Sequence, residues 1–185
     1  MIESKNLILR ETTFDDCMIF ADWECREDVS QYLSVDSDHS YEDIVKEFFT
    51  NMGDESKRYF TIVLKSEEKV IGRVYLSKIN LKLDSLDLTR IYIADENYRN
   101  KGYGEEAIRA ILEYAFINLH MERVTIDHFA DNETAHYLYR KIGFEDEGKM
   151  RHSGKKDGKY YDMELMSMLR VEYYDKIHLK WKKDL

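Results

Sequence analysis

A basic, glycine-containing segment in the second half of the chain has the residue types that bind phosphate. It runs from Tyr98 to Gly104 with the sequence Y-R-N-K-G-Y-G, follows a predicted strand and opens a predicted helix. The first turn of a helix leaves backbone N–H groups unpaired and carries a partial positive charge. Glycine lets the backbone approach a ligand closely, and Arg99 and Lys101 add full positive charges. Together these features indicate a site for a pyrophosphate group.

Two other interpretations of this segment stay open. Its glycines could simply form a turn. Gly102, Gly104 and Ala107 also fit the G-x-G-x-x-A pattern of dinucleotide-binding loops, and Asp127 then stands where such folds place a ribose-binding acid. A dinucleotide loop normally follows its strand directly, however, whereas residues 95–101 intervene here. The G-x-x-x-x-G-K-[ST] pattern of kinase-type phosphate loops is absent from the sequence.

Two segments of the chain resemble motifs of the GNAT family of N-acetyltransferases. Arg99 to Gly104 matches the family pattern [Q/R]-x-x-G-x-[G/A]. Asn132 to Phe144 (N-E-T-A-H-Y-L-Y-R-K-I-G-F) is similar to N-x-x-A-x-x-x-Y-x-K-x-G-F, and the two motifs stand in the family's order. The resemblance covers about residues 6–172. The segment from Gly158 to Tyr173 resembles the branch that contains ribosomal-protein and spermidine acetyltransferases.

This resemblance implies an α+β fold, with a twisted mixed β-sheet flanked by helices and acetyl-CoA held in a V-shaped opening between central strands. The loop amides would hold the pyrophosphate, and a strand that splits from its neighbour would bind the acetyl carbonyl and pantetheine arm. Asn132 is also a natural helix N-cap, and Lys141 has an alternative as an ordinary surface residue. The implied coenzyme-binding residues are Ile91, Tyr92, Ile93, Arg99, Asn100, Lys101, Gly102, Tyr103, Gly104, Asn132, Ala135 and Lys141.

The resemblance implies acetyl transfer to a primary amine, by direct attack of the amine on acetyl-CoA. The amine would belong to a polyamine such as spermidine, a protein N-terminus or another small molecule. A second hypothesis is a non-catalytic acyl-CoA sensor on the same fold. The acidic residues of one N-terminal segment could line an amine site or could form a solvated helix face; they are Asp22, Glu24, Glu27 and Asp28.

Tyr139 is the candidate acid, because it occupies the family's tyrosine position in the second motif. A phenol with an ordinary pKa near 10 is protonated at neutral pH and can donate its proton to a leaving thiolate. The alternative is a packing aromatic residue, since the chain has 14 tyrosines. Tyr137 is expected to point elsewhere, because residues two apart on a helix do not share a face.

Asp87 is the candidate general base that would take the proton from the amine. Many relatives carry a glutamate on this strand, and Asp87 is the acid in one plausible alignment, whereas the other puts Leu88 there. Because a bulge shifts the facing of a strand by one residue, alternation does not decide between them. The alternative is a solvated charge at the start of a strand, with water or another acid as the base.

Neither the histidines nor the cysteines form a pattern typical of a metal site or a covalent intermediate. The histidines lack a spacing such as H-x-x-x-H, so no metal is expected. Cys17 and Cys25 have no histidine close in sequence, and both are expected to be reduced core residues.

The elements that position these residues follow from hydrophobic periodicity and helix caps. Strand patterns come first as an antiparallel meander, then a strand–helix–strand unit, a further helix and a terminal hairpin. Capping signals occur at Thr13 with Asp16, at Ser40 with Asp43, and at Asn132. Strands are expected at residues 6–12, 58–65, 70–79, 85–94, 123–129, 144–150 and 160–169, and helices at 13–25, after 40, at 104–118, at 132–142 and after 170.

Length and composition set the class of protein. The 185 residues, 43% of them hydrophobic, suit one folded domain, with its core at about residues 6–172 and a charged tail at 173–185. The net charge of −9 argues against nucleic-acid binding and suits a cationic substrate. No long apolar run predicts a membrane span or a signal peptide, so a cytoplasmic protein is expected. Members of the family that it resembles are often dimers.

Overall fold

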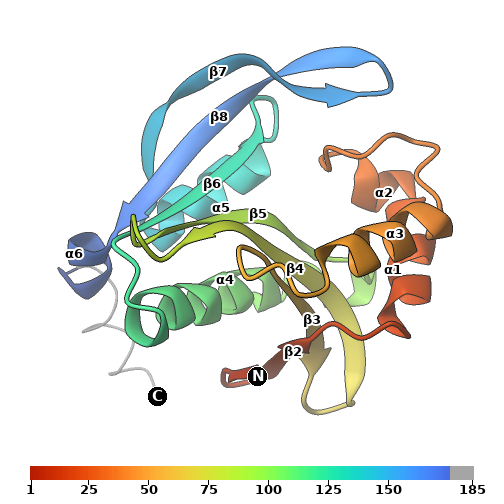
Figure 1. The fold of residues 1–185 in the computed structure, drawn as a ribbon, viewed down its shortest axis with the longest axis horizontal. Coiled ribbons are helices and arrows are strands. Elements are labelled where there is room, and N and C mark those ends of the chain that lie inside the picture. Colours follow the sequence, from red (N-terminus) through yellow and green to blue (C-terminus); the bar gives the residue numbers. More distant parts are fainter. Residues whose placement is uncertain (176–185) are drawn as a thin grey trace.

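The computed structural model describes residues 1–175, which build one eight-stranded mixed sheet flanked by helices (Figure 1). The sheet order is β1-β2-β3-β4-β5-β6-β8-β7. This confirms the predicted antiparallel meander and the hairpin at the end. The strands are β1 (Ile2–Glu3), β2 (Leu7–Glu11), β3 (Arg58–Leu64), β4 (Lys69–Asn80), β5 (Ser85–Ile93), β6 (Arg123–Phe129), β7 (Glu145–Lys156) and β8 (Lys159–Leu169).

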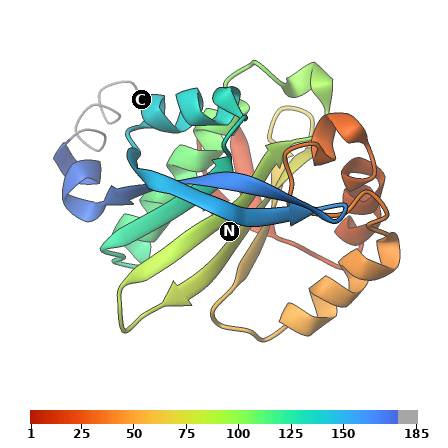
Figure 2. The ribbon, with the colours of Figure 1, turned by 90° about the horizontal axis from the view of Figure 1, so that it is seen from above.

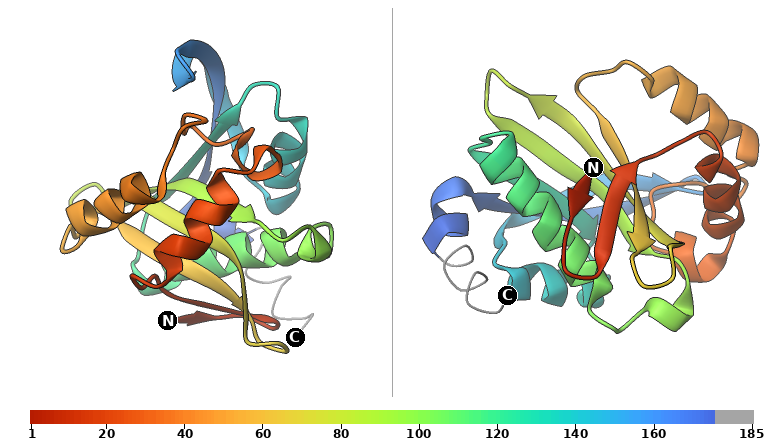
Figure 3. Two further views of the ribbon diagram at one scale, coloured as in Figure 1. Left: turned by 90° about the vertical axis from the view of Figure 1, so that its right-hand side faces the viewer. Right: turned by 90° about the horizontal axis from the view of Figure 1, so that it is seen from below.

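Helices cover both faces of the sheet (Figure 3). On one face, α4 and α5 pack on a core that includes Leu86, Ile108 and Ile142, all nearly inaccessible to solvent. On the other face, α1 and α3 enclose a smaller cluster with Phe20 and Ile44. The helices are α1 (Asp16–Glu24), α2 (Glu27–Ser30), α3 (Tyr41–Asn51), α4 (Tyr103–Glu113), α5 (Glu133–Ile142) and α6 (Arg170–Tyr173), with a 3₁₀ turn at Glu96–Tyr98 and a π-helical turn at Tyr114–Asn118.

The parallel contact between β5 and β6 is short. It comprises Ser85 to Asp87 on β5 and Arg123 to Thr125 on β6. Beyond Asp87 and Thr125 the two strands diverge, as the ribbon shows (Figure 1). The sheet therefore opens in its middle, in the way that the family resemblance implied.

Local cap chemistry explains where two helices begin. Ser40 and Asp43 form a reciprocal capping box at the start of α3. At the start of α1, the Asp16 carboxylate accepts a hydrogen bond from the Thr13 N–H at 2.8 Å. The start of α3 agrees with the prediction from sequence. The predicted start of the first helix at Thr13 was wrong, because α1 begins at Asp16 and Thr13 lies in the turn before it.

Some elements differ from the sequence prediction. The strand expected at residues 144–150 continues to Lys156. The prediction was too short because β7 is an exposed edge strand whose residues show no alternation of apolar and polar side chains. The short β1 and α2 were not predicted. Cys17 is buried as expected, but the prediction was wrong for Cys25, which is exposed at the end of α1 and donates its thiol hydrogen to the Asp22 carbonyl. Part of the tail at 173–185 lies outside the described residues.

Three hydrogen bonds, which we call the hairpin latch, join the tip of the β7–β8 hairpin to α2 and to the segment that follows it. The Ser37 N–H donates to the Asp157 carboxylate at 2.7 Å, and the Asp157 N–H donates to the Asp36 carboxylate at 2.6 Å. Lys156 Nζ donates to the Ser30 carbonyl at 2.6 Å. The hairpin thus crosses over to α2, as the view from above shows (Figure 2).

Within residues 1–175, no helix is long and apolar enough to span a membrane.

Candidate active site

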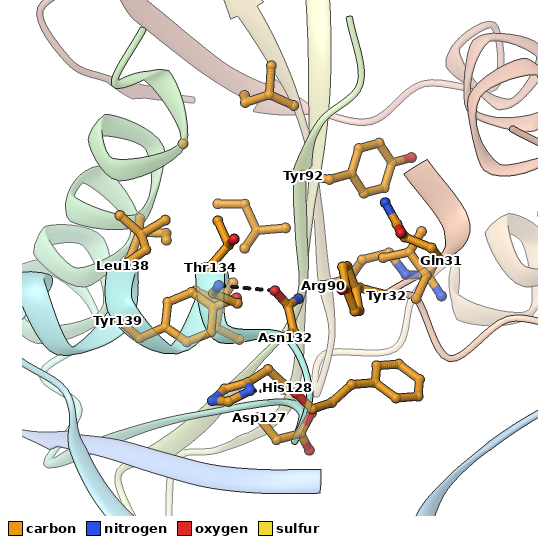
Figure 4. A pocket seen from close by; sticks show the side chains of 18 of the residues that line it. Gln31, Tyr32, Arg90, Tyr92, Asp127, His128, Asn132, Thr134, Leu138 and Tyr139 are labelled. Carbon is orange, nitrogen blue, oxygen red and sulfur yellow. Dashed lines mark hydrogen bonds between the residues drawn. The ribbon is translucent and has the colours of Figure 1, made fainter. Parts of the chain in front are cut away.

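A cavity of about 810 Å³ opens where β5 and β6 diverge. Its walls come from α2 and the segment after it, from β5, from residues 98–105, from the end of β6 and from α5. Figure 4 shows α5, with Thr134, Leu138 and Tyr139, facing a second wall. This second wall consists of Gln31 and Tyr32, which follow α2, and of Arg90 and Tyr92 on β5.

A β-bulge sets the facing of β5 along the cavity. Tyr75 on β4 lies opposite Arg90, and the next residue, Leu76, lies opposite Leu88, so Thr89 is the extra residue. From Leu88 onward, β5 has a partner strand on its β4 edge only. Ile91, Tyr92 and Ile93, predicted to bind the coenzyme, all line the cavity. The free edge of β5 therefore offers backbone hydrogen-bonding groups along the cavity.

The predicted phosphate loop lies at one end of the cavity. Asn100 and Gly102 have φ values of 57° and 85°, a left-handed conformation that turns successive amides toward a common point. The first hydrogen bond of α4 runs from the Glu106 N–H to the Gly102 carbonyl. The backbone N–H groups of residues 100–105 form no hydrogen bond within the described chain. The loop is thus a cradle of free amides.

Arg99 fixes this loop to the end of β5. Its guanidinium donates to the carbonyls of Ile93 and Ala94 at 2.9 and 2.8 Å and pairs with Asp28 at 2.8 Å. The pairing with Arg26 and Arg99 lowers the pKa of Asp28 to about 2. Arg99 therefore holds the loop in position and also contributes a positive charge to it.

Not every residue of the predicted loop faces the cavity. Arg99, Asn100, Gly102 and Gly104 line it, whereas Lys101 and Tyr103 do not. The Lys101 ammonium lies 5.6 Å from the centre of the Tyr98 ring, and the Tyr103 ring packs 6.4 Å from that ring. These two residues support the loop from outside.

The first turn of α5 forms part of the wall beside the loop. Asn132 caps this helix, and its side-chain oxygen accepts the Ala135 N–H at 3.1 Å (Figure 4). Asn132, Ala135 and Lys141 all line the cavity. Lys141 donates to Glu105 at 2.6 Å, which joins α5 to the first turn of α4. Asn132 is thus a helix cap and Lys141 a largely exposed residue, and both also face the cavity.

Tyr139 projects from α5 into the cavity wall and is only 8% exposed. Its ring packs 5.8 Å from His128 and 6.1 Å from Phe144, between ring centres. The hydroxyl has no hydrogen-bond partner among residues 1–175. Burial and, to a smaller extent, the charge of Asp127 raise the pKa of Tyr139 above its ordinary value. The phenol is therefore protonated and available to a ligand.

Asp87, the predicted base, does not line the cavity. Its carboxylate accepts hydrogen bonds from the hydroxyls of Thr89 and Thr125, each at 2.7 Å, and lies 3.9 Å from Lys78 Nζ. The side chain is 7% exposed. The structure thus places Asp87 at the junction of β5 and β6, where each of its carboxylate oxygens accepts one hydroxyl hydrogen bond.

Asp127, near the end of β6, does line the cavity, together with Asp28 and Glu105, which are both paired with basic side chains. Burial, followed by the charge of Asp87, raises the pKa of Asp127. The sequence pattern suggested only a ribose-binding role for Asp127. A usable signal was its position at the carboxyl end of a parallel strand that follows a crossover helix, where α/β folds bind ligands.

The acidic N-terminal segment does not form an acidic wall. Glu24 is buried and pairs with Arg73 at 2.7 Å and Arg90 at 3.3 Å, while Tyr92 donates its hydroxyl to it at 2.7 Å. Asp28 lines the cavity but is paired with arginines. Glu24 therefore joins α1 to β4 and β5.

Comparison with known proteins agrees with this geometry. Residues 6–145 match the family model described as acetyltransferase (GNAT) domain. The uncharacterized N-acetyltransferase YnaD of Bacillus subtilis is 26% identical over 176 residues, covering 93% of this chain and 98% of the relative. The spermidine N(1)-acetyltransferase of Vibrio cholerae is 24% identical over 173 residues, covering 94% and 98%.

The solved structures that match share the fold. The crystal structure of spermidine N-acetyltransferase from Vibrio cholerae in complex with CoA and spermine superposes with a TM-score of 0.82 at 23% identity, covering 91% of this chain and 98% of that one. The Vibrio enzyme has also been solved as a dodecamer. Because the family model matches most of this chain, the chain belongs to the GNAT family of acetyltransferases.

Proposed function

We propose that this protein transfers an acetyl group from acetyl-CoA to a primary amine by direct attack. The observation that carries the proposal is the arrangement of one cavity. It has a cradle of free amides at one end, the free edge of β5 along its side, and the unpaired hydroxyl of Tyr139 beside the carboxylate of Asp127. These are the parts that acyl transfer to an amine requires.

The residues present fit acetyl-CoA. A Cβ atom built on Gly104 would have one neighbour, a side-chain atom of Ile93 at 4.0 Å, and one built on Gly102 would have none within 4 Å. That room, over unpaired amides, suits a pyrophosphate. The edge from Ile91 to Ile93 would bind the pantetheine arm, and Asn132 and Ala135 would face it from α5.

Acetyl-CoA supplies the thioester, whose carbonyl carbon the amine attacks. Asp127 would take the proton from the amine, directly or through a water molecule, as the C–N bond forms. Backbone N–H groups of the free β5 edge would stabilise the charge that develops on the carbonyl oxygen. Tyr139 would give its proton to the sulfur as the C–S bond breaks, which leaves free CoA and an acetylated amine.

The amine is best sought among polyamines and protein N-termini. Relatives at about a quarter identity include spermidine N(1)-acetyltransferases. In this chain, the Asp127 carboxylate forms no hydrogen bond or ion pair within residues 1–175, so it is available to an amine. Asp28 and Glu24 already have arginine partners. A single free carboxylate favours acceptors that need one anionic contact close to the reacting nitrogen.

A non-catalytic acyl-CoA sensor is the second candidate, and one experiment separates the two. Release of free thiol from acetyl-CoA is measured with spermidine, amino-acid amides, aminoglycosides and N-terminal peptides of ribosomal proteins, while calorimetry measures acetyl-CoA binding. Amine-dependent thiol release supports the transferase. Binding without release for any amine supports the sensor, and absence of binding rejects both.

We also propose that the protein acts in the cytoplasm as a homodimer or larger homo-oligomer. Sedimentation velocity of the purified chain measures its mass in solution. A species at the monomer mass of 22.2 kDa across the concentration range would reject self-association.

A further inference from the structure

At the edge of the cavity, which His128 also lines, three side chains from three elements converge on one point. They are His128 on β6, His136 on α5 and Glu164 on β8. We propose that they form a binding site for a divalent transition-metal ion of the zinc class. This inference does not depend on the proposed function.

The spacing of the three ligand atoms matches a tetrahedral ion. His136 Nδ1 lies 3.3 Å from His128 Nε2 and 3.3 Å from Glu164 Oε2, and His128 Nε2 lies 3.8 Å from that oxygen. Zinc bonds of about 2.0–2.1 Å in tetrahedral geometry separate ligand atoms by about 3.3–3.4 Å. The three side chains therefore need only small adjustments to coordinate one ion.

The ring of His128 is held in the tautomer that a metal ligand needs. Its Nδ1 lies 2.8 Å from the carbonyl oxygen of Phe129. Because a carbonyl oxygen only accepts hydrogen bonds, Nδ1 carries the hydrogen, and the lone pair of the neutral ring is on Nε2, facing His136. A backbone carbonyl that orients a histidine in this way is a regular feature of metal sites.

The sheet register makes the site rigid on one side and open on the other. His128 and Glu164 are direct partners in the β6–β8 ladder, and the His128 side chain is only 3% exposed. The side chains of His136 and Glu164 are 37% and 30% exposed. An ion can thus enter from solvent, and water or Asp146, 3.9 Å from His136 Nδ1, can complete its coordination.

Nitrogen and carboxylate ligands in this number are typical of zinc and its neighbours in the first transition row. The histidine spacing in the sequence predicted no metal site, and the three ligands are separated by 8 and 28 residues and belong to different elements. The bound ion would clamp α5, which carries Tyr139, to the sheet. The alternative occupant of this space is a proton, shared in a His–His–Glu hydrogen-bond network.

Metal binding by the tag-free chain tests the proposal. After treatment with a chelator, the protein is titrated with Zn²⁺ alone by calorimetry, and with Co²⁺ while the visible absorption of tetrahedral cobalt is recorded. We expect one ion per chain. His136→Ala and Glu164→Gln, both at partly exposed positions, should each weaken binding at least about tenfold. Zn²⁺ should also raise the Tm of the original chain but not of His136→Ala.

His152→Ala is the matched control, because His152 is exposed on β7 and is not one of the three ligands. It should bind Zn²⁺ as the original chain does. The proposal is overturned if the original chain binds no ion, or if His136→Ala and Glu164→Gln bind as tightly as His152→Ala. Either result would assign the cluster to the hydrogen-bond network.

Discussion

The Asp87 carboxylate accepts a hydrogen bond from the Thr125 hydroxyl at 2.7 Å, and these two residues are also the last paired position between β5 and β6. The same carboxylate accepts the hydroxyl of Thr89, the residue at the bulge. Asp87 therefore fastens the point from which the two strands diverge. The carboxylate stabilises this junction and does not line the cavity.

Replacing Asp127 and Asp87, one at a time, by asparagine distinguishes their roles. Asp127→Asn should lower kcat by about 10²–10⁴-fold, because it removes the only unpaired carboxylate that we find in the cavity wall. The Kd for acetyl-CoA should change little. Steady-state kinetics with the best amine, together with calorimetry, measures both quantities.

Asp87→Asn is the matched control for that variant. Its amide oxygen can still accept a hydrogen bond from Thr89 or Thr125, so kcat should stay close to that of the original chain. The free energy of unfolding should fall by about 1–3 kcal/mol, because a buried charged acceptor is replaced by a neutral one. A loss of kcat in Asp87→Asn, with normal kcat in Asp127→Asn, would return the base to Asp87.

Removing the hydroxyl of Tyr139 tests the acid. Tyr139→Phe keeps the ring packed against His128 and Phe144, and the hydroxyl has no partner within residues 1–175, so stability should change little. If the phenol protonates the sulfur, kcat should fall by about 10²–10⁴-fold, with a much smaller change in KM for acetyl-CoA. Tyr137→Phe, 73% exposed, is the control and should be nearly silent. Unchanged kcat in Tyr139→Phe, with chemistry rate-limiting, would exclude this role.

A branched side chain at Gly104 tests the phosphate cradle. Gly104 has ordinary helical geometry, and an added Cβ meets only one side-chain atom, so Gly104→Val should fold. Its methyl groups would occupy the space over the free amides and should weaken acetyl-CoA binding by at least about tenfold, or about 1.4 kcal/mol. Calorimetry measures the affinity, and Gly104→Ala should show an intermediate loss. A folded valine variant with unchanged affinity would place the pyrophosphate elsewhere.

The ion pair between the partly exposed Arg10 and the buried Asp16 predicts a pH-dependent stability. Burial by itself would raise the pKa of Asp16, but hydrogen bonds from Arg10, Thr13 and Thr61 lower it below its ordinary value. A lowered folded-state pKa stabilises the fold above the unfolded-state value, and this contribution is lost as the pH falls through the folded-state pKa. Asp16→Asn should therefore cost about 1.5–3 kcal/mol at pH 7.

Urea unfolding across a pH series measures this effect. The difference in unfolding free energy between the original chain and Asp16→Asn should shrink as the pH falls below about 4, where the unfolded carboxyl takes up its proton. Asp22→Asn, exposed on the same helix, should change stability little at any pH. A constant difference between the original chain and Asp16→Asn over the whole series would contradict the linkage.

Features that depend on neighbours in sequence could be predicted from the sequence. The capping box at Ser40, the cap at Asn132 and the loop from Arg99 to Gly104 are each specified within a few residues, and the structure contains all three. Strands with one buried face were likewise predictable from alternation. The edge strand β7 was predicted too short, because most of its residues are exposed and its alternation is absent.

Features that depend on register between distant strands could not be predicted. Whether Asp87 or Asp127 reaches the cavity is decided by the bulge at Thr89 and by where β6 stops pairing with β5. Likewise, His128 meets Glu164 only because the β6–β8 register places them opposite each other. No local pattern encodes either relationship.

The hairpin latch joins parts of the chain that are 120 to 126 residues apart in sequence. Bringing such distant segments together costs loop-closure entropy that a few surface hydrogen bonds do not offset. We therefore expect the latch to form late in folding, after the sheet has already brought α2 and the hairpin close. A nascent chain can assemble its phosphate loop from sequence neighbours, but the hairpin residues that line the cavity, Ser153, Gly154 and Met163, can take their places only when the final strand has been synthesised.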